Sequence, residues 1–245
     1  MTLFSKSDHR RNESGSMKIG GLQKLTLLDF PGHVACTVFT SGCNWRCPFC
    51  HNALLLSGQE EIDEEGIFTY LKKRRGILDG VAITGGEPLL HPDLEELSLR
   101  IRDLGLAVKL DTNGSFPDRL EALIKKGMLD YVAMDIKNAP GQYETTIGCE
   151  KAPLENVQKS IDLLMNGTLP FEFRTTVVRE LHSEIGLAEI GRWLKGAPKY
   201  FIQPYRDSDG VLVRGFHAPE REELIRMLQA VRLGIPTAEI RGEDV

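Results

Sequence analysis

The sequence predicts an α/β protein whose parallel strands form a partial, open (β/α)6 barrel. Apolar runs rich in β-branched residues alternate with helical patterns along the chain, which is typical of right-handed strand–helix–strand units. Polar and glycine-rich motifs follow several of these runs, as expected where a site lies at the carboxyl ends of parallel strands. The chain has 245 residues, close to the ~250 residues of a closed α/β barrel. About six units can be counted, fewer than closure requires, so an open barrel is expected.

Six segments have the composition of buried β-strands. The first reads VACTVFT and is rich in the β-branched and aromatic residues that strands prefer. The third is followed by Asp111, and the fourth carries Asp135 near its end. The strands are therefore expected at residues 34–40, 80–84, 107–110, 131–136, 171–178 and 200–204.

Helical periodicity fills the intervals between these strands. Leu94, Leu97, Ile101 and Leu104 recur at a spacing of three or four, for example, and Gly105 follows as a stop signal. The other helical patterns lie near residues 67–75, 120–124, 157–165, 185–194 and 220–231. Residues 17–245 are expected to form one domain that holds all of these elements, and the polar residues 1–16 to form a disordered tail.

Composition excludes several classes of function. Lys and Arg number 30 and Asp and Glu 35, which gives a net charge of −5 and argues against nucleic-acid binding through bulk positive charge. No run of about 18 apolar residues is present, which argues against a membrane span. The N-terminus lacks a secretory apolar region, so the cytoplasm, where thiols stay reduced, is the expected compartment.

Three closely spaced cysteines carry the strongest functional signal. Cys43, Cys47 and Cys50 follow the first expected strand with the spacing C-x3-C-x2-C. The chain has five cysteines, an odd number, so a disulfide framework explains them poorly. Three thiolates on one short loop suit a soft metal centre. An iron–sulfur cubane held by three cysteines leaves one iron free to bind a substrate or cofactor.

A structural zinc site is the alternative to a cluster. Zinc normally takes four ligands, and the fourth would be His51 or Cys149. His51 directly follows Cys50, and adjacent residues seldom reach the same tetrahedral ion. Cys149 lies far along the chain in an expected loop, and Cys36 lies within the first strand. The spacing therefore favours a cluster over zinc, and it leaves open the roles of Cys36, Cys149 and His182.

Polar motifs at the ends of later strands would converge on the same rim as the cysteines. Residues 85–88 (GGEP) follow the second strand and residues 111–114 (DTNG) the third. Each could equally be an ordinary strand-to-helix turn. Asp135 lies in an apolar strand, so it needs a partner when buried, and Lys137 could supply it. Arg174 lies in an equally apolar strand and would need an anion.

The cysteine loop resembles the signature of the radical S-adenosylmethionine superfamily. The stretch GLQKLTLLDFPGHVACTVFTSGCNWRCPFCHN, residues 21–52, further resembles the activating proteins of glycyl radical enzymes, specifically the family that activates anaerobic ribonucleoside-triphosphate reductase. The lead-in LLDFPG, residues 27–32, narrows the resemblance to that family. The resemblance covers about residues 17–240.

The resemblance implies a set of cofactor contacts. Cys43, Cys47 and Cys50 would hold a [4Fe–4S] cluster and so form the catalytic centre. Its open iron would chelate the amino and carboxylate groups of S-adenosylmethionine. The other matching positions are Phe49 near the adenine, Gly85, Gly86 and Glu87 near the methionyl amino group, Asp111, Thr112, Asn113, Asp135 and Lys137 near the carboxylate and ribose, and Arg174 as a basic residue facing the cofactor. Asp111, Thr112 and Asp135 could also hold a monovalent cation.

The resemblance also implies a reaction and a partner. The cluster would cleave S-adenosylmethionine reductively, and the resulting 5′-deoxyadenosyl radical would take a hydrogen atom from a glycine of anaerobic ribonucleoside-triphosphate reductase. The alternatives are a formate acetyltransferase-type glycyl radical enzyme as target, a small molecule as in deazaguanine synthesis, and a non-enzymatic metal-binding regulatory module. The electron donor would be of flavodoxin or ferredoxin type. Residues 72–75 (KKRR) could dock such an acidic donor, and Asn44 and Trp45 are expected near the docking surface of the partner.

Overall fold

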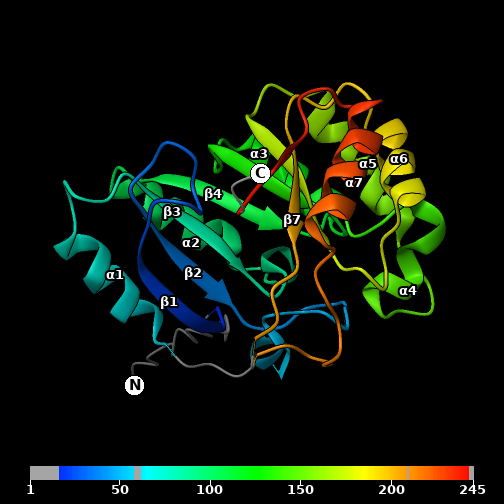
Figure 1. Cartoon of the computed structure of the whole chain (residues 1–245). Helices are drawn as coiled ribbons and strands as arrows, with labels where there is room; N and C mark the ends of the chain where they lie inside the picture. Colours follow the sequence, from blue (N-terminus) through cyan, green and yellow to red (C-terminus); the bar gives the residue numbers. More distant parts are fainter. Residues whose placement is uncertain (1–16, 58–61, 209, 243–245) are drawn as a thin grey trace, which may run out of the picture.

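The computed structural model describes residues 17–57, 62–208 and 210–242. In this part of the chain, eight strands form one sheet in chain order, from β1 at one edge to β8 at the other (Figure 1). β1 and β2 are antiparallel, and all later neighbours are parallel. The strands are β1 (Ile19–Thr26), β2 (Ala35–Thr40), β3 (Gly80–Gly85), β4 (Ala107–Thr112), β5 (Tyr131–Asp135), β6 (Phe171–Val177), β7 (Tyr200–Pro204) and β8 (Glu239–Ile240).

Helices occupy the connections between the parallel strands. Short 3-10 turns lie near several strand ends, at η1 (Ala53–Ser57), η2 (Pro88–Leu90) and η3 (Pro140–Gln142). The helices are α1 (Glu64–Lys73), α2 (Leu94–Asp103), α3 (Pro117–Lys125), α4 (Tyr143–Ile147), α5 (Leu154–Met165), α6 (Glu184–Trp193) and α7 (Arg221–Arg232). An open parallel sheet with crossover helices confirms the expected fold class.

The six expected strands are all present, and three further elements were not expected. β1 contains two consecutive glycines and pairs antiparallel, so it lacks the pattern of a buried parallel strand. β8 has two residues and α4 has five, lengths that leave no periodicity to detect. The expected tail at residues 1–16 lies outside the described residues, as do the last three residues of the expected domain.

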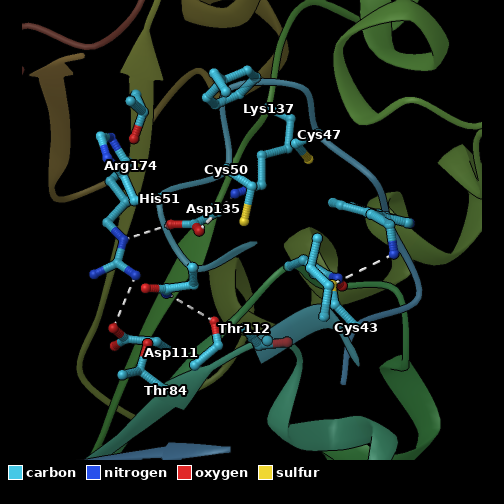
Figure 2. Close-up of a pocket in the computed structure, with 18 residues that line it drawn as sticks. Cys43, Cys47, Cys50, His51, Thr84, Asp111, Thr112, Asp135, Lys137 and Arg174 are labelled. Carbon is cyan, nitrogen blue, oxygen red and sulfur yellow. Dashed lines mark hydrogen bonds and ion pairs between the residues drawn. The ribbon is translucent and has the colours of Figure 1, made fainter. Parts of the chain in front are cut away.

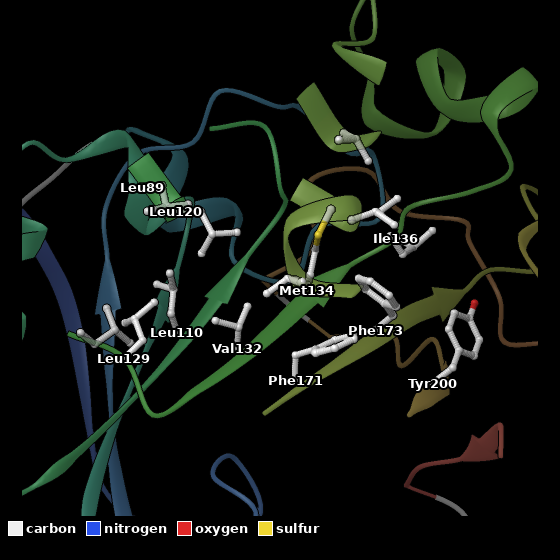
Figure 3. Packing of buried hydrophobic residues seen from close by; sticks show 14 of the residues in the cluster. Leu89, Leu110, Leu120, Leu129, Val132, Met134, Ile136, Phe171, Phe173 and Tyr200 are labelled. Carbon is white, nitrogen blue, oxygen red and sulfur yellow. The ribbon is translucent and has the colours of Figure 1, made fainter. Parts of the chain in front are cut away.

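The two faces of the sheet differ in character. One face is apolar and packs against the helices, with Leu110 of β4, Val132 and Met134 of β5, and Phe173 of β6 in a continuous buried cluster (Figure 3). Because side chains alternate along a strand, the intervening residues face the inside of the barrel. These include Lys109, Asp111, Asp135, Glu172 and Arg174, so the inner face is charged. Charge inside a barrel needs internal partners, which the site below provides.

Phe30 packs against the amino-terminal end of the barrel. Its ring stacks on His33 at 4.0 Å between centroids, and it clusters with Ala35, Ala107 and Tyr131, which lie at or near the starts of β2, β4 and β5. The first residue of β3, Gly80, has no room for a Cβ, which would lie 2.7 Å from the Phe30 ring. Phe30 therefore covers the end of the barrel opposite to the cysteine loop.

The basic run at residues 72–75 is solvent-exposed at the end of α1. Arg75 forms a β-bridge with Leu78, just before β3 begins. The run therefore lies at the amino-terminal end of the sheet, whereas the cysteine loop follows the carboxyl end of β2. An electron donor bound to this run would lie far from the cysteines. Among the described residues, no helix is both long and apolar enough to cross a membrane.

Replacing Phe30 with Ala is expected to destabilise the protein without altering the carboxyl end of the barrel. Phe30 is 1% exposed, so the change leaves a cavity and should lower the free energy of unfolding by about 3–4 kcal/mol. Leu28→Ala is the matched control, because Leu28 is 85% exposed two residues away. Urea unfolding measures both variants, and equal stability of the two would contradict the packing role of Phe30.

Candidate active site

A cavity opens at the carboxyl ends of β2 to β6, where the sequence motifs converge (Figure 2). It encloses about 870 Å³ of empty space, its open mouth included. Every predicted site residue except Glu87 lines it, which brings together segments far apart in the sequence. The predicted residues in the lining are Cys43, Cys47, Phe49, Cys50, Gly85, Gly86, Asp111, Thr112, Asn113, Asp135, Lys137 and Arg174.

The cysteine loop is fixed mainly by backbone contacts with its neighbours. Gly42, at a φ of 88°, starts the loop, and its N–H donates to Leu55 of η1 (2.6 Å). The N–H of Arg46 donates to Ile147 at the end of α4 (2.9 Å). Gly148 follows at a φ of 65°, and a Cβ there would lie 2.3 Å from the Arg46 carbonyl oxygen. The unexpected helix α4 therefore packs directly behind the cysteines.

The three thiols line the cavity wall from one side. Burial raises the pKa of Cys43 to about 11 and that of Cys47 to about 12. Without a metal these two thiols are therefore protonated at neutral pH, and metal binding must release their protons. Across residues 17–57, 62–208 and 210–242, no three His, Cys, Asp or Glu side chains are placed to hold a single metal ion.

Gly85 and Gly86 allow the end of β3 to lie against the start of the cysteine loop. A Cβ on Gly86 would lie 1.8 Å from the carbonyl oxygen of Gly42, and one on Gly85, whose φ is 118°, would lie 2.3 Å from that of Thr40. The N–H of Gly86 donates to Thr40 (2.9 Å), and the Asn52 amide donates to the carbonyl of Gly85 (3.1 Å). A side chain at Gly86 would displace the start of the cysteine loop, and one at Gly85 would displace the end of β2.

A ladder of alternating charges crosses the inner face beside the thiols (Figure 2). Arg174 of β6 binds two carboxylates: its Nε donates to Asp135 and its Nη2 to Asp111 (2.9 Å). Lys137 donates to the second oxygen of Asp135 (2.8 Å), and Lys109, 1% exposed, pairs with Asp111. The contact expected between Asp135 and Lys137 is thus confirmed, and Arg174 has two anionic partners, Asp135 and Asp111.

The ladder lowers the pKa of both of its carboxylates. Burial alone would raise the pKa of Asp135, but Arg174 and Lys137 outweigh burial and hold this pKa well below its usual range. Arg174 and Lys109 likewise lower the pKa of Asp111. Three cations against two carboxylates leave one positive charge in excess, so the cavity suits a ligand with an anionic group. The two carboxylates expected to hold a monovalent cation share the guanidinium of Arg174 in this structure.

Several residues named in the sequence lie outside the cavity lining. The carboxylate of Glu87 is buried and does not line the cavity. It accepts hydrogen bonds from the hydroxyl of Thr112 and the N–H of Asn113. Cys36 is fully buried within β2, and Cys149 lies behind the cysteine loop, its Sγ 3.9 Å from the carbonyl oxygen of Asn44. His182 is buried, with Nε2 bonded to the carbonyl of Lys137 (2.8 Å), so it fixes the backbone there.

Asn44 and Trp45 of the cysteine loop differ in exposure. Asn44 is exposed, but Trp45 is 2% exposed and lines the cavity. The ring of Trp45 lies edge-on to Tyr143 of α4, with 5.9 Å between centroids. The unexpected helix α4 therefore buries this ring, which belongs to the cavity wall.

Other lining residues were missed, although the sequence held signals for some of them. Thr176 lies two residues after Arg174 and so shares its face of β6, and Thr84 occupies the corresponding end of β3. His51 and Asn52 directly follow the last cysteine of the loop. Leu56 reaches the lining only through the turn η1, which the sequence pattern does not indicate.

Comparison with known proteins places this site in a family. The family model described as Radical SAM superfamily matches residues 37–185. A protein of Methanocaldococcus jannaschii named as a glycyl-radical enzyme activating enzyme is 32% identical over 196 residues, which cover 78% of this chain and 81% of the relative. The pyruvate formate-lyase-activating enzyme of Clostridium pasteurianum is 28% identical over 153 residues, covering 59% of this chain and 63% of the relative.

A solved structure agrees in fold. The structure of Streptococcus suis SuiB bound to S-adenosylmethionine has a TM-score of 0.64 and 14% sequence identity. The match covers 82% of this chain and 48% of that protein. At this identity the likeness concerns the fold alone.

Replacing Arg174 with Ala is expected to change how the free energy of unfolding depends on pH, compared with the wild type. In the wild type, the lowered pKa values of Asp111 and Asp135 stabilise the protein above about pH 4, and this contribution is lost as the pH falls further. Without Arg174, the two buried carboxylates lose their shared partner, so the variant should lose about 3 kcal/mol at neutral pH and less near pH 3.

Urea unfolding at both pH values measures this difference. Arg226→Ala is the matched control, because Arg226 pairs with Glu184 on the exposed surface, and little or no change is expected there. A loss in Arg174→Ala that is independent of pH would show that the ladder does not control the ionisation of the two carboxylates.

Proposed function

This chain belongs to the radical S-adenosylmethionine superfamily, and we propose that within it the chain activates a glycyl radical enzyme, with anaerobic ribonucleoside-triphosphate reductase as the first candidate. The observation that carries the proposal is the match to a glycyl-radical enzyme activating enzyme over 78% of this chain, together with three thiols beside a cationic ladder in one cavity. Members of this superfamily are enzymes that use a [4Fe–4S] cluster and S-adenosylmethionine.

The residues of the cavity fit these two groups. Three thiols on one loop are the donor set that an iron–sulfur cubane takes, with one iron left open. The glycine pair at the end of β3 brings backbone to the cavity with no side chain between. The excess positive charge of the ladder suits the carboxylate of the cofactor. When bound, the cluster and S-adenosylmethionine supply a one-electron reductive cleavage that yields methionine and a 5′-deoxyadenosyl radical.

Residues of the cavity would bind the cluster, orient S-adenosylmethionine and shield the radical from water. In this proposal Cys43, Cys47 and Cys50 hold the cluster, and Arg174 and Lys137 orient the cofactor carboxylate. Gly85, Gly86, Asp111, Thr112, Asn113 and Asp135 surround the remaining polar groups, and Phe49 lies by the adenine. The buried rings of Trp45 and Phe49 form the apolar part of the wall and exclude water from a reactive radical.

A glycine of a partner protein is the proposed hydrogen donor. Glycine has no side chain, so a loop that carries it can enter a narrow site. The sequence resemblance in residues 27–32 supports the reductase as partner, but Phe30 of this segment lies at the opposite end of the barrel, so the segment does not select the partner by contact at the cavity. The relative from C. pasteurianum favours a second candidate, a formate-lyase-type glycyl radical enzyme.

The proposed reaction also needs an electron donor and a reducing compartment. A low-potential donor of flavodoxin or ferredoxin type would reduce the cluster. The site would work in the cytoplasm, where thiols stay reduced. Since the basic run at residues 72–75 lies at the far end of the sheet, the donor would approach the cavity end of the barrel instead.

The cluster ligands can be tested by composition. Anaerobically reconstituted protein should hold about four irons per chain, and changing Cys43, Cys47 or Cys50 to Ala should remove most of the iron. Cys149→Ala is the matched control, because Cys149 lies behind the same loop but outside the cavity lining. Iron and acid-labile sulfide analysis measures both. Loss of iron in Cys149→Ala would contradict the three-cysteine assignment.

The target can be tested by spectroscopy. This protein, a strong one-electron reductant and S-adenosylmethionine are mixed anaerobically with an anaerobic ribonucleotide reductase encoded beside it. Electron paramagnetic resonance should detect a glycine-centred doublet, and reductase activity should rise with it. A radical on a formate acetyltransferase but never on the reductase would assign the second candidate. Cofactor cleavage with no radical on either protein would contradict the activase function.

A further inference from the structure

The side chain of Glu87 connects neighbouring loops through hydrogen bonds. Its carboxylate is fully buried and lies outside the cavity, although the two glycines before it line that cavity. Oε1 accepts hydrogen bonds from the N–H of Leu89 (3.0 Å) and from the hydroxyl of Thr112 (2.8 Å), and Oε2 accepts one from the N–H of Asn113 (2.7 Å). All three donors are uncharged.

These contacts join three of the loops that build the cavity. The backbone N–H of Glu87 donates to Gly42 (2.9 Å), next to the first cysteine of its loop. The carboxylate holds Thr112 and Asn113 at the end of β4, and both of these residues line the cavity. The side-chain amide of Asn113 then donates to Asn44 in the cysteine loop (3.0 Å). One buried residue at the end of β3 therefore connects the loops that follow β2 and β4.

We propose that Glu87 is a positioning residue for S-adenosylmethionine: through Thr112 and Asn113, its carboxylate sets the end of β4 against the cysteine loop without touching the cofactor. A buried carboxylate that meets only uncharged donors is costly to maintain. It is retained here because only a carboxylate offers acceptors to all three donors at once. The inference rests on the cofactor of the superfamily and not on which protein is the partner.

The protonation state of Glu87 decides whether its side chain can accept all three hydrogen bonds. In the protonated acid, and in the amide of a Gln at this position, a hydrogen-bond donor takes the place of one carboxylate oxygen. This donor then faces a group that donates to the carboxylate in the wild type, so that hydrogen bond is lost. Burial raises the pKa of Glu87 to about 7, so both forms occur near neutral pH. Among the neighbouring titratable groups, Asp135 stays ionised in this range, burial lowers the pKa of His91, and Cys43 is a proposed cluster ligand.

The test measures S-adenosylmethionine affinity by equilibrium titration of the cluster-loaded protein, with iron content determined for every sample. At about pH 8, Glu87→Gln should bind about tenfold more weakly with its iron complement unchanged, because one buried N–H loses its acceptor. In the double variant Glu87→Gln/Thr112→Val, the loss of affinity should be smaller than the product of the two single losses, because both changes weaken the connection between Glu87 and the end of β4. Losses that multiply in the double variant would overturn the proposal.

Glu172→Gln is the matched control. Glu172 is equally buried and also lies outside the cavity lining, where it accepts hydrogen bonds from Tyr131 and Arg241. Its change should leave the affinity within about twofold of the wild type. From about pH 6 to 8, the wild-type affinity should rise more steeply than that of Glu87→Gln, because only the wild type gains from the ionisation of Glu87. Parallel profiles of the two proteins, or an equal loss in Glu172→Gln, would contradict a positioning role.

Discussion

Asp111 and Asp135 face one another on neighbouring strands, and the guanidinium of Arg174 binds both. Parallel pairing imposes this arrangement, because Asp135 and Arg174 are register partners and β4 lies directly beside β5. Two unpaired carboxylates buried side by side would be strongly destabilising. Lys109 and Lys137 extend the pairing at both ends. The ladder ties β4, β5 and β6 together and leaves one positive charge in excess beside the cavity.

The two ends of the barrel differ in their packing and in what they contribute to the protein. Phe30 covers the amino-terminal end with an aromatic ring against short side chains and a glycine, so that end contributes stability. At the carboxyl end, Gly86 lies so close to Gly42 that the loops after β2 and β3 behave as one unit. α4 closes this unit from behind, through the contact of Gly148 with Arg46. The cavity is thus built from backbone contacts that leave little room for substitution.

The sequence predicted six of the eight described strands and twelve of the eighteen residues that line the cavity, because strand ends in a parallel sheet meet at one rim. Asp135 and Arg174 could each be predicted to need an opposite charge, and Lys137 was expected for Asp135. That Arg174 binds both Asp135 and Asp111 depends on the strand register. The direction of the Glu87 side chain could not be predicted, because it depends on donors from Leu89 and the end of β4 that only the folded chain brings together. The burial of Trp45 was missed for the same reason, since it depends on α4, a helix too short to leave a periodic signal.

The proposed hydrogen transfer from a partner glycine can be followed most directly with an isotope. The partner reductase is prepared with glycine deuterated at Cα and mixed anaerobically with this protein, reductant and unlabelled S-adenosylmethionine. Mass spectrometry of the 5′-deoxyadenosine formed then reports the source of the transferred hydrogen. Direct abstraction predicts that deuterium enters 5′-deoxyadenosine in step with reductase activation. Activation accompanied only by unlabelled 5′-deoxyadenosine would contradict a direct transfer from glycine.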